Sequence, residues 1–415
     1  MNLRRLSAVG VVVLSVLAGV VLPVAGAAAA AATAPASVTI TGHGYGHGRG
    51  MSQYGAFGYA LSGWGYEDIL RKYYGGTKLA TTARAAATTR ITVRLSALID
   101  RDIKVTVPKA SFTVAGTIHF PAGRAVTMVA RPDGYINVYR AVGCAGKGTR
   151  IAIIKGSQGV IVPDVTPGND VTKMLTVCRS GVDPAYRGRL TFIPRADPAR
   201  PTATVRRTIN TVSLDDYLRG VVPREAIASW GDAGGGKGMN ALRVQTVAAR
   251  TYAAAENRYP YAKTCDTTAC QVYGGAGSRG ARIEDPRTDA AVRYTSGKVL
   301  LTPTGTFAYA EFGSSSGGWT AGGQFPAVSD TGDATPSNPY HNWSVRKDIR
   351  TLGPRFGVGT LKSAVVKTRN GLGADGGRVL TVLLTGTTGR TATVSGDDVR
   401  LALGLYSNWF VLHTG

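Results

Sequence analysis

Acidic residues are scarce in this sequence of 415 residues. It contains 25 Asp and Glu residues against 48 Lys and Arg residues, so its formal net charge is +23 at pH 7. A strongly basic protein attracts polyanions, and nucleic acid is the usual first candidate. The sequence has no helix-turn-helix, zinc-finger or aromatic RNA-binding motif, and we therefore exclude nucleic acid as the expected partner.

Long apolar runs are also rare, and only the amino-terminal run is long enough to span a membrane. Arg4 and Arg5 precede an apolar run over residues 6–24, which an Ala/Gly tract with small-residue cleavage options follows. This is the pattern of an export signal, so we interpret residues 1–32 as a signal peptide; an uncleaved anchor is the alternative. Anionic wall polymers are the polyanions that an exported basic protein meets, unless the charge only aids solubility.

Only four cysteines are present: Cys144, Cys178, Cys265 and Cys270. An even number of cysteines in an exported protein predicts disulfides. The most economical pairing joins Cys144 to Cys178 and Cys265 to Cys270, because each pair then lies within one local segment. No histidine lies in the segment around Cys265 and Cys270, whereas a structural zinc site needs about four ligands. We predict neither a metal nor a cofactor.

The most informative stretch of the chain surrounds Glu225. Ser213, Asp215 and Asp216 stand where a helix would begin, because such residues cap the helix and favour the positive end of its dipole. Pro223 predicts a bend that ends the helix and places Glu225 where a side chain can face a cleft. A carboxylate with apolar neighbours has a raised pKa, as a general acid requires; the alternative is a solvated surface glutamate.

An alanine-rich helix is predicted from Asn240 to Asn257, because apolar residues and alanines recur there with helical spacing. Gln245 and Tyr252 lie on one stripe of this helix. Since alanines allow close packing, we interpret the segment as a buried central helix. It would display Gln245 and Tyr252 beside Glu225 as a wall for a polar substrate.

Glycine occupies every second position from residue 42 to residue 50. An extended strand would place His43, Tyr45, His47 and Arg49 on one face and bare backbone on the other. Another chain or a sugar can approach such a backbone closely. At about 3.3 Å per residue, the two histidines would lie roughly 13 Å apart on this strand, which excludes a metal shared between them.

From Ile91 to about Arg207 the pattern is β, because short alternating runs are broken by Gly, Pro and Asp. We predict one barrel or sandwich here, joined by the Cys144–Cys178 disulfide and without chemistry of its own. Together with the central helix this gives an α+β fold. It is β-rich and multi-lobed, with a central alanine-rich helix and a β-rich accessory region.

A strand is expected over Phe307–Phe312, followed by the loop GSSSGG. The loop formally matches the Gly-x-Ser-x-Gly motif of a nucleophilic serine, Ser315, with a downstream histidine as its base. That motif needs a helix after the serine, and the glycine-rich run over residues 318–323 is a poor helix former. We therefore interpret Ser314 and Ser315 as loop groups that hydrogen-bond a sugar.

Four elements together resemble the SpoIID/LytB family, which contains stage II sporulation protein D and the amidase-modifier proteins. They are LDDYLRGVVPREAIASW with ALRVQTVAARTYA, which resembles the core signature; TCDTTACQVYGG, which resembles the Cys-x4-Cys-QVY element; TFAYAEFGSSSGGWT, which resembles the strand and Ser/Gly loop; and NPYHNWSV, which resembles the Pro-Tyr segment. Together they cover most of residues 185–415.

The resemblance implies an activity and a substrate. Members similar to stage II sporulation protein D are lytic transglycosylases of peptidoglycan, and the Glu of their VVPxE motif, matched here by Glu225, is the catalytic acid/base. Other members enhance a partner amidase, so the alternative is a non-catalytic module that binds cell-wall glycan; an extracellular serine hydrolase is a distant third. The candidates for binding or orienting sugar are Arg224, Gln245, Arg250, Tyr252, His47, Ser314 and Ser315.

The order of the motifs departs from the family. TGHGYGHGRGMSQYGAFGYA resembles an element that lies at the carboxyl end of other members, whereas this chain ends with LGLYSNWFVLHTG. This implies a circular permutation. The strands around His43–His47 and Trp409–Leu412 should then pair or lie adjacent, and the histidine face should contribute to the cleft near Glu225.

Two further departures concern the site. Some members hold zinc with histidines beside the paired cysteines, and those histidines are missing here. A glycine-rich break, Gly231–Gly238, separates the proposed site from the central helix. It would either form a mobile lid or displace Glu225 and leave a non-catalytic binder.

We accordingly divide the chain into five parts. They are the signal peptide (1–32), the His/Gly strand with its helices (33–84), the β-rich accessory region (85–205), the catalytic core (206–345) and a carboxyl-terminal β segment that completes the core (346–415).

Overall fold

The structure is a computed structural model that describes residues 33–194, 196–197, 200–204 and 206–413. The signal peptide predicted at residues 1–32 lies outside the described residues. Within them, no helix combines the length and the apolar character that crossing a membrane requires.

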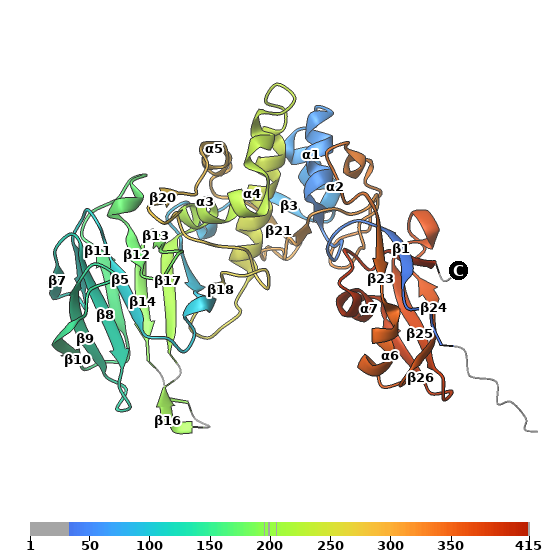
Figure 1. The fold of residues 1–415 in the computed structure, drawn as a ribbon. Coiled ribbons are helices and arrows are strands. Elements are labelled where there is room, and N and C mark those ends of the chain that lie inside the picture. The colour runs from blue at the N-terminus through green and yellow to red at the C-terminus, as the bar shows by residue number, and fades with distance from the viewer. Residues whose placement is uncertain (1–32, 195, 198–199, 205, 414–415) are drawn as a thin grey trace, which may run out of the picture.

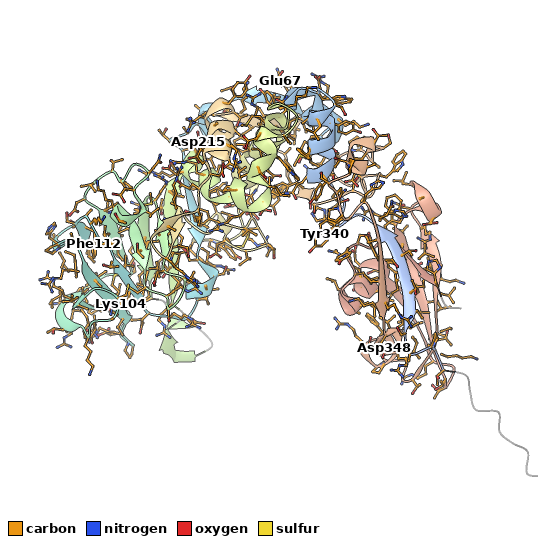
Figure 2. All side chains as sticks on the ribbon, turned by 45° about the horizontal axis from the view of Figure 1, so that its top comes forward. Glu67, Lys104, Phe112, Asp215, Tyr340 and Asp348 are labelled. Carbon is orange, nitrogen blue, oxygen red and sulfur yellow. A yellow bond between two sulfur atoms is a disulfide. The ribbon has the colours of Figure 1, made fainter. Side chains whose placement is uncertain are left out.

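The described residues form an arch (Figure 1). A large β-rich lobe stands at one end, helices form the top, and a smaller β-rich lobe stands at the other end. Figure 2 places Phe112 and Lys104 in the large lobe and Asp348 in the small lobe. The predicted α+β class and the β-rich, multi-lobed architecture are confirmed.

The described residues contain seven α-helices, and the first five form the top of the arch. They are α1 (Gln53–Leu61), α2 (Tyr66–Tyr73), α3 (Leu214–Glu225), α4 (Met239–Ala255), α5 (Pro286–Tyr294), α6 (Leu352–Arg355) and α7 (Gly396–Leu403). The alanine-rich helix expected from Asn240 is α4. It is buried along most of its length, because its alanines let α1, α3 and α5 pack closely against it.

Two sheets build most of the large lobe, and all their strand pairs are antiparallel except the parallel pair of β18 and β4. The first has the order β10-β9-β8-β5-β12-β13-β19-β20: β10 (Thr149–Ile154), β9 (Ile136–Val142), β8 (Arg124–Ala130), β5 (Ile103–Thr106), β12 (Leu175–Val177), β13 (Pro184–Tyr186), β19 (Gly277–Ser278) and β20 (Ala281–Arg282). The second has the order β18-β4-β17-β14-β11-β6-β7: β18 (Thr264–Cys265), β4 (Arg90–Arg94), β17 (Arg207–Ser213), β14 (Arg189–Ile193), β11 (Gly159–Pro163), β6 (Phe112–Val114) and β7 (Ile118–Phe120). A separate hairpin pairs β15 (Ala196–Asp197) with β16 (Arg200–Thr204).

The two sheets of the large lobe share one hydrophobic core, so the lobe is a sandwich. This core continues without a break into α3 and α4, through Leu218 and Ala249 among others. The predicted disulfide between Cys144 and Cys178 joins the ends of β9 and β12, with a Cα–Cα distance of 5.4 Å. The sandwich therefore supports the helices directly.

The small lobe is built around the first strand of the described chain. β1 (Val38–His43) lies between β23 (Asn342–Lys347) and β27 (Phe410–His413), and Gly42 stands opposite Phe410. The rest of the lobe is a sheet of β24 (Leu361–Arg369), β25 (Val379–Gly386) and β26 (Thr391–Ser395) with α6 and α7. The predicted adjacency of the two ends of the chain is confirmed.

The prediction of an extended strand through the alternating glycines is wrong beyond His43, where β1 ends. Gly44, Gly46, Gly48 and Gly50 all have positive φ, from 65° to 104°, which is a left-handed conformation rather than a β-strand. The alternation of faces survives, because the glycines face neighbouring chain while the residues between them face outward. A Cβ atom on Gly50 would come within 2.0 Å of the Glu311 carbonyl oxygen, so the segment needs glycine in order to pack.

The prediction of a strand over Phe307–Phe312 is also wrong. Only Phe312 and Gly313 (β22) pair as a strand, with Met51 and Ser52 (β2). The residues before them form two successive three-residue turns, in which Ala310 N–H donates to the Ala308 carbonyl and Glu311 N–H to the Tyr309 carbonyl. A further pair joins β3 (Lys78–Thr81) to β21 (Lys298–Leu301).

We predict that Gly50→Ala destabilises the protein more than Gly76→Ala. Both glycines have positive φ, at 65° and 84°, so each substitution should cost about 1–2 kcal/mol of backbone strain. Nothing lies within 4 Å of a Cβ atom on Gly76, whereas the carbonyl of Glu311 blocks one on Gly50. Urea unfolding should therefore give a clearly larger loss for Gly50→Ala, and equal losses would contradict the close packing described here.

Candidate active site

Helix α3 places Glu225 at its carboxyl end. The side chain of Ser213 caps the helix by accepting a hydrogen bond from Asp216 N–H, and Asp215 and Asp216 occupy the first turn. Pro223 lies in the last turn, and the helix ends at Glu225. The predicted helix start and the predicted position of Glu225 at an element end are both confirmed.

The carboxyl group of Glu225 is held in one place and partly removed from water. Its Oε1 accepts a hydrogen bond of 2.6 Å from Val272 N–H. Burial raises the pKa of the Glu225 carboxyl above its ordinary value, and the Val272 hydrogen bond opposes this shift by stabilising the ionised form. The backbone of Glu225 is fixed as well, because its carbonyl accepts a hydrogen bond of 2.8 Å from Gln53 Nε2.

The segment that carries Val272 is anchored between α3 and α4. Tyr217 Oη on α3 donates to Gln271 Oε1 at 3.0 Å, and Gln271 Nε2 donates to the Ala249 carbonyl on α4 at 3.3 Å. The disulfide between Cys265 and Cys270, which was predicted, closes the loop just before it. These contacts hold the Val272 N–H group in the position from which it donates to Glu225.

Glu225 opens into a polar cleft with a volume of about 260 Å3. Five separate parts of the chain line it, which explains why the sequence alone does not reveal its full composition. The lining residues are His47, Arg49, Glu225, Tyr252, Thr268, Ala269, Cys270, Glu311 and Phe312. The structure thus brings together three of the residues predicted for catalysis or sugar binding, Glu225, His47 and Tyr252. Of the expected histidine face, His47 and Arg49 line the cleft, whereas His43 hydrogen-bonds Asn342.

His47 is a neutral hydrogen-bond donor in this cleft. Its Nδ1 accepts a hydrogen bond of 2.9 Å from the backbone N–H of Arg49, so the proton of the neutral ring is on Nε2. Burial, and after it the positive charge of Arg49, lowers the pKa of His47 to about 4. At neutral pH the ring therefore offers an N–H group without adding charge.

Glu311 is a second carboxylate of the cleft that sequence reasoning missed. Arg49 binds it through Nε, at 3.0 Å from both carboxylate oxygens, and through Nη2, at 2.7 Å from Oε1. The hydrogen bond to Glu311 raises the pKa of Arg49. Hydrogen bonds to the Glu311 carbonyl from Tyr74 Oη and Met51 N fix the backbone. The only sequence signal was a lone acidic residue two positions before the Ser/Gly loop.

Tyr252 presents a phenol to the same cleft from α4. Burial, followed by the negative charge of Glu256, raises the pKa of Tyr252 to about 12, so its hydroxyl keeps its proton at neutral pH. Its ring packs edge-on against Tyr309, with a centroid distance of 5.9 Å. The cleft therefore contains neutral donors from two different segments, His47 and Tyr252.

Five predicted binding residues do not line the cleft, and three of them lie on α3 and α4. Gln245 is buried behind the cleft and accepts a hydrogen bond of 3.1 Å from Gln53 Nε2, so it supports Glu225 indirectly. Arg250 is fully buried, and its guanidinium donates to Asp215 at 2.8 Å. Arg250 therefore forms a structural ion pair with Asp215 and does not contact sugar. Arg224 is exposed, and its guanidinium packs against Gly274.

The Ser/Gly loop is held by a buried aspartate. Ser315 is buried and donates to Asp333 Oδ2 at 2.8 Å, and His341 Nδ1 lies 2.9 Å from the same oxygen. A nucleophilic serine needs the imidazole beside its hydroxyl, with the carboxylate behind the imidazole, whereas here the carboxylate stands between them. Ser314 accepts from Tyr54 N–H through its carbonyl at 3.0 Å. Neither serine lines the cleft.

The glycine-rich break, Gly231–Gly238, lies outside the lining of the cleft. It starts in a 3-10 helix, Ala228–Asp232, and continues as turns into α4. The ring of Trp230, just before it, stacks on Phe57 with a centroid distance of 4.5 Å. The break contributes no residue to the cleft lining given above, and the site remains assembled beside it.

The described residues contain no group of three or more His, Cys, Asp and Glu side chains arranged to hold a metal ion. Cys265 and Cys270 form a disulfide, so their sulfur atoms are not available as thiolate ligands. The titratable groups that line the cleft are two carboxyl groups, an imidazole, a guanidinium and a phenol.

Comparison with known proteins bears on the part of the chain that contains Glu225. A family described as Stage II sporulation protein (SpoIID) matches residues 203–301. The amidase enhancer of Bacillus subtilis (strain 168) is 41% identical over 103 residues, which are 25% of this chain and 12% of that protein. An uncharacterised protein of Brachyspira hyodysenteriae is 35% identical over 124 residues, 28% of this chain and 30% of that protein. No solved structure matches.

These matches cover less than a third of either relative's length. The family segment includes α3, α4 and Val272, whereas His47, Arg49 and Glu311 lie outside it. The resemblance inferred from the motifs is confirmed for this segment, because residues 203–301 match the SpoIID family.

Proposed function

We propose that this protein is an exported lytic transglycosylase that cleaves the glycan strands of peptidoglycan with Glu225 as its single acid/base. The proposal rests on the environment of the Glu225 carboxyl group. The group faces a polar cleft, and burial raises its pKa. A general acid needs a proton near the working pH. The SpoIID match over the same residues supports this choice of chemistry.

The reaction requires one carboxyl group in two successive roles. Protonated Glu225 donates its proton to the glycosidic oxygen, and the bond between that oxygen and C1 of the muramic acid unit breaks. The resulting carboxylate then removes the proton of the C6 hydroxyl, whose oxygen bonds to C1 and closes an anhydro ring. Glu225 ends protonated, as it began. The Val272 N–H group stabilises the intermediate carboxylate without blocking its second oxygen.

Glu311 does not compete for the acid/base role. Hydrolytic glycosidases normally use two carboxyl groups, one of which acts as nucleophile or activates water. Both oxygens of Glu311 are engaged by Arg49, so we assign Glu311 to holding the guanidinium in place. The neutral donors His47 and Tyr252 are then suited to orienting sugar hydroxyl and acetamido groups.

A second candidate is a glycan-binding module that enhances a cell-wall amidase. The name of the Bacillus subtilis relative, amidase enhancer, favours it. The net charge of +23 would aid retention on anionic wall polymers in either case. The two candidates differ in one respect: only the first requires the proton of Glu225.

We predict that Glu225→Gln abolishes the formation of anhydro-muramyl products. Gln keeps the size and hydrogen-bonding capacity of the side chain but cannot deliver the proton, and general acid–base catalysis typically contributes roughly 10²- to 10⁴-fold in rate. Purified peptidoglycan, intact and stripped of peptides, would be incubated with parent and variant and analysed by mass spectrometry. Glu311→Gln is the matched control, and it should slow the reaction but leave the anhydro product unchanged.

Products from both the parent and Glu225→Gln would place the catalytic group elsewhere. If the parent yields no products but binds glycan, the binding-module candidate is favoured.

We also predict a bell-shaped dependence of kcat/KM on pH. The rate should fall at high pH as Glu225 loses its proton, with a midpoint above the ordinary carboxyl pKa of 4.5 because burial raises the pKa. It should fall again below about pH 4, where His47 becomes charged. His47→Asn keeps an acceptor for Arg49 N–H, so this variant should lose the acidic limb and keep the alkaline one. An alkaline midpoint below 4.5 would rule out Glu225 as the acid.

A further inference from the structure

The cleft is small compared with the polymer that it is proposed to bind. Its volume of about 260 Å3 lies below the roughly 300–1,000 Å3 of pockets that enclose a drug-sized ligand. It can therefore enclose only a short part of a glycan strand. The remaining sugars must lie on the surface beside the cleft, where groups that bind sugar rings are to be sought.

Three tyrosines form an exposed cluster on that surface. Tyr45, Tyr340 and Tyr406 contact one another, with centroid distances of 4.7, 5.4 and 5.5 Å. Tyr45 is 39% exposed and Tyr406 is 37% exposed. Figure 2 shows Tyr340 on the inner side of the arch, where the helices meet the small lobe. We call these three residues the tyrosine platform.

The tyrosine platform is fixed relative to the cleft by backbone hydrogen bonds. Tyr45 stands two residues before His47, and Tyr45 and Ser315 exchange N–H···O bonds of 2.9 and 3.2 Å. Gly46 N–H donates to the Tyr406 carbonyl at 2.9 Å. Gly44, just before Tyr45, packs against the buried backbone of Ser315 and Ser316, whereas the Tyr45 side chain is exposed. The segment that supplies His47 to the cleft thus also supplies the platform.

The rings of the platform also connect to the other side of the catalytic helix. Tyr54 lies edge-on to Tyr340 at 6.3 Å and to Trp230 at 5.2 Å. Trp230 follows Glu225 by five residues. A series of ring contacts therefore runs from the buried Trp230, in the 3-10 helix after Glu225, through Tyr54 to the platform.

We propose that the tyrosine platform is a second glycan subsite, which binds sugar units of the same strand whose scissile bond lies beside Glu225. The inference rests on the proposed function, because it takes peptidoglycan glycan as the ligand. A tyrosine ring offers an apolar face to the C–H groups of a sugar and a hydroxyl at its edge, and it loses little conformational entropy on binding. Packing between the lobes would account for the contacts among the rings, but not for two rings remaining more than a third exposed.

The test measures how affinity depends on the length of the glycan. Peptide-free glycan oligosaccharides of two, four and six sugars would be titrated against full-length mature protein carrying Glu225→Gln, so that no cleavage occurs. Affinity should rise with length. Tyr45→Ala and Tyr406→Ala should remove this rise and weaken binding of the hexasaccharide by roughly fivefold to tenfold. Both variants should bind the disaccharide like their parent, which a misfolded protein would not do.

Two controls separate ring stacking from other effects. Tyr45→Phe keeps the ring and should retain most of the length dependence. Tyr135→Ala removes a ring that is 40% exposed in the large lobe and should change nothing. Equal hexasaccharide affinity in Tyr45→Ala, Tyr406→Ala and the parent would overturn the subsite.

The outcome is independent of whether the protein cuts glycan. If no anhydro products form but Tyr45→Ala removes the length dependence, the subsite stands and the proposed catalysis fails. If anhydro products form but length dependence survives in both alanine variants, the catalysis stands and the subsite is overturned.

Discussion

Removing the carboxyl group of Glu225 from water is the constraint on which the site depends. Burial alone would make the ionised form of the group costly, and a single hydrogen bond from Val272 N–H offsets part of that cost. The surrounding contacts serve to keep that N–H in position. Gln271 ties its segment to α3 and α4, and the Cys265–Cys270 disulfide closes the loop in front of it. Burial thus favours the protonated form of the carboxyl, whereas the Val272 hydrogen bond favours the ionised form.

The opposite wall of the cleft comes from segments distant in sequence. His47 and Arg49 follow β1, which completes a sheet with strands from the carboxyl-terminal end of the chain. Arg49 then pairs with Glu311, 262 residues later. Both ends of the described chain must therefore be folded together before the cleft exists. The circular permutation implied by the motifs agrees with this closure and stays a prediction.

Local physics made one half of the site predictable. Capping residues, Pro223 and the alanine spacing indicated α3 and α4, and they placed Glu225 at a helix end. Helical spacing cannot say which face meets the cleft, and this is why Gln245 and Arg250 were assigned to sugar binding although both are buried. Glu311 was missed because its partner is far away in sequence. The alternating glycines indicated the two faces correctly but not the left-handed backbone.

The cleft presents one carboxyl group with an unengaged oxygen, one carboxylate bound by Arg49, and two neutral donors. Such a set favours proton transfer by a single group and leaves no second carboxylate to activate water. The most direct measurement is to run the reaction in ¹⁸O-labelled water and determine the mass of the released glycan by mass spectrometry. Transglycosylation adds no solvent oxygen, so we expect unlabelled anhydro products. One ¹⁸O atom for each broken bond would show hydrolysis and contradict the single-carboxyl mechanism.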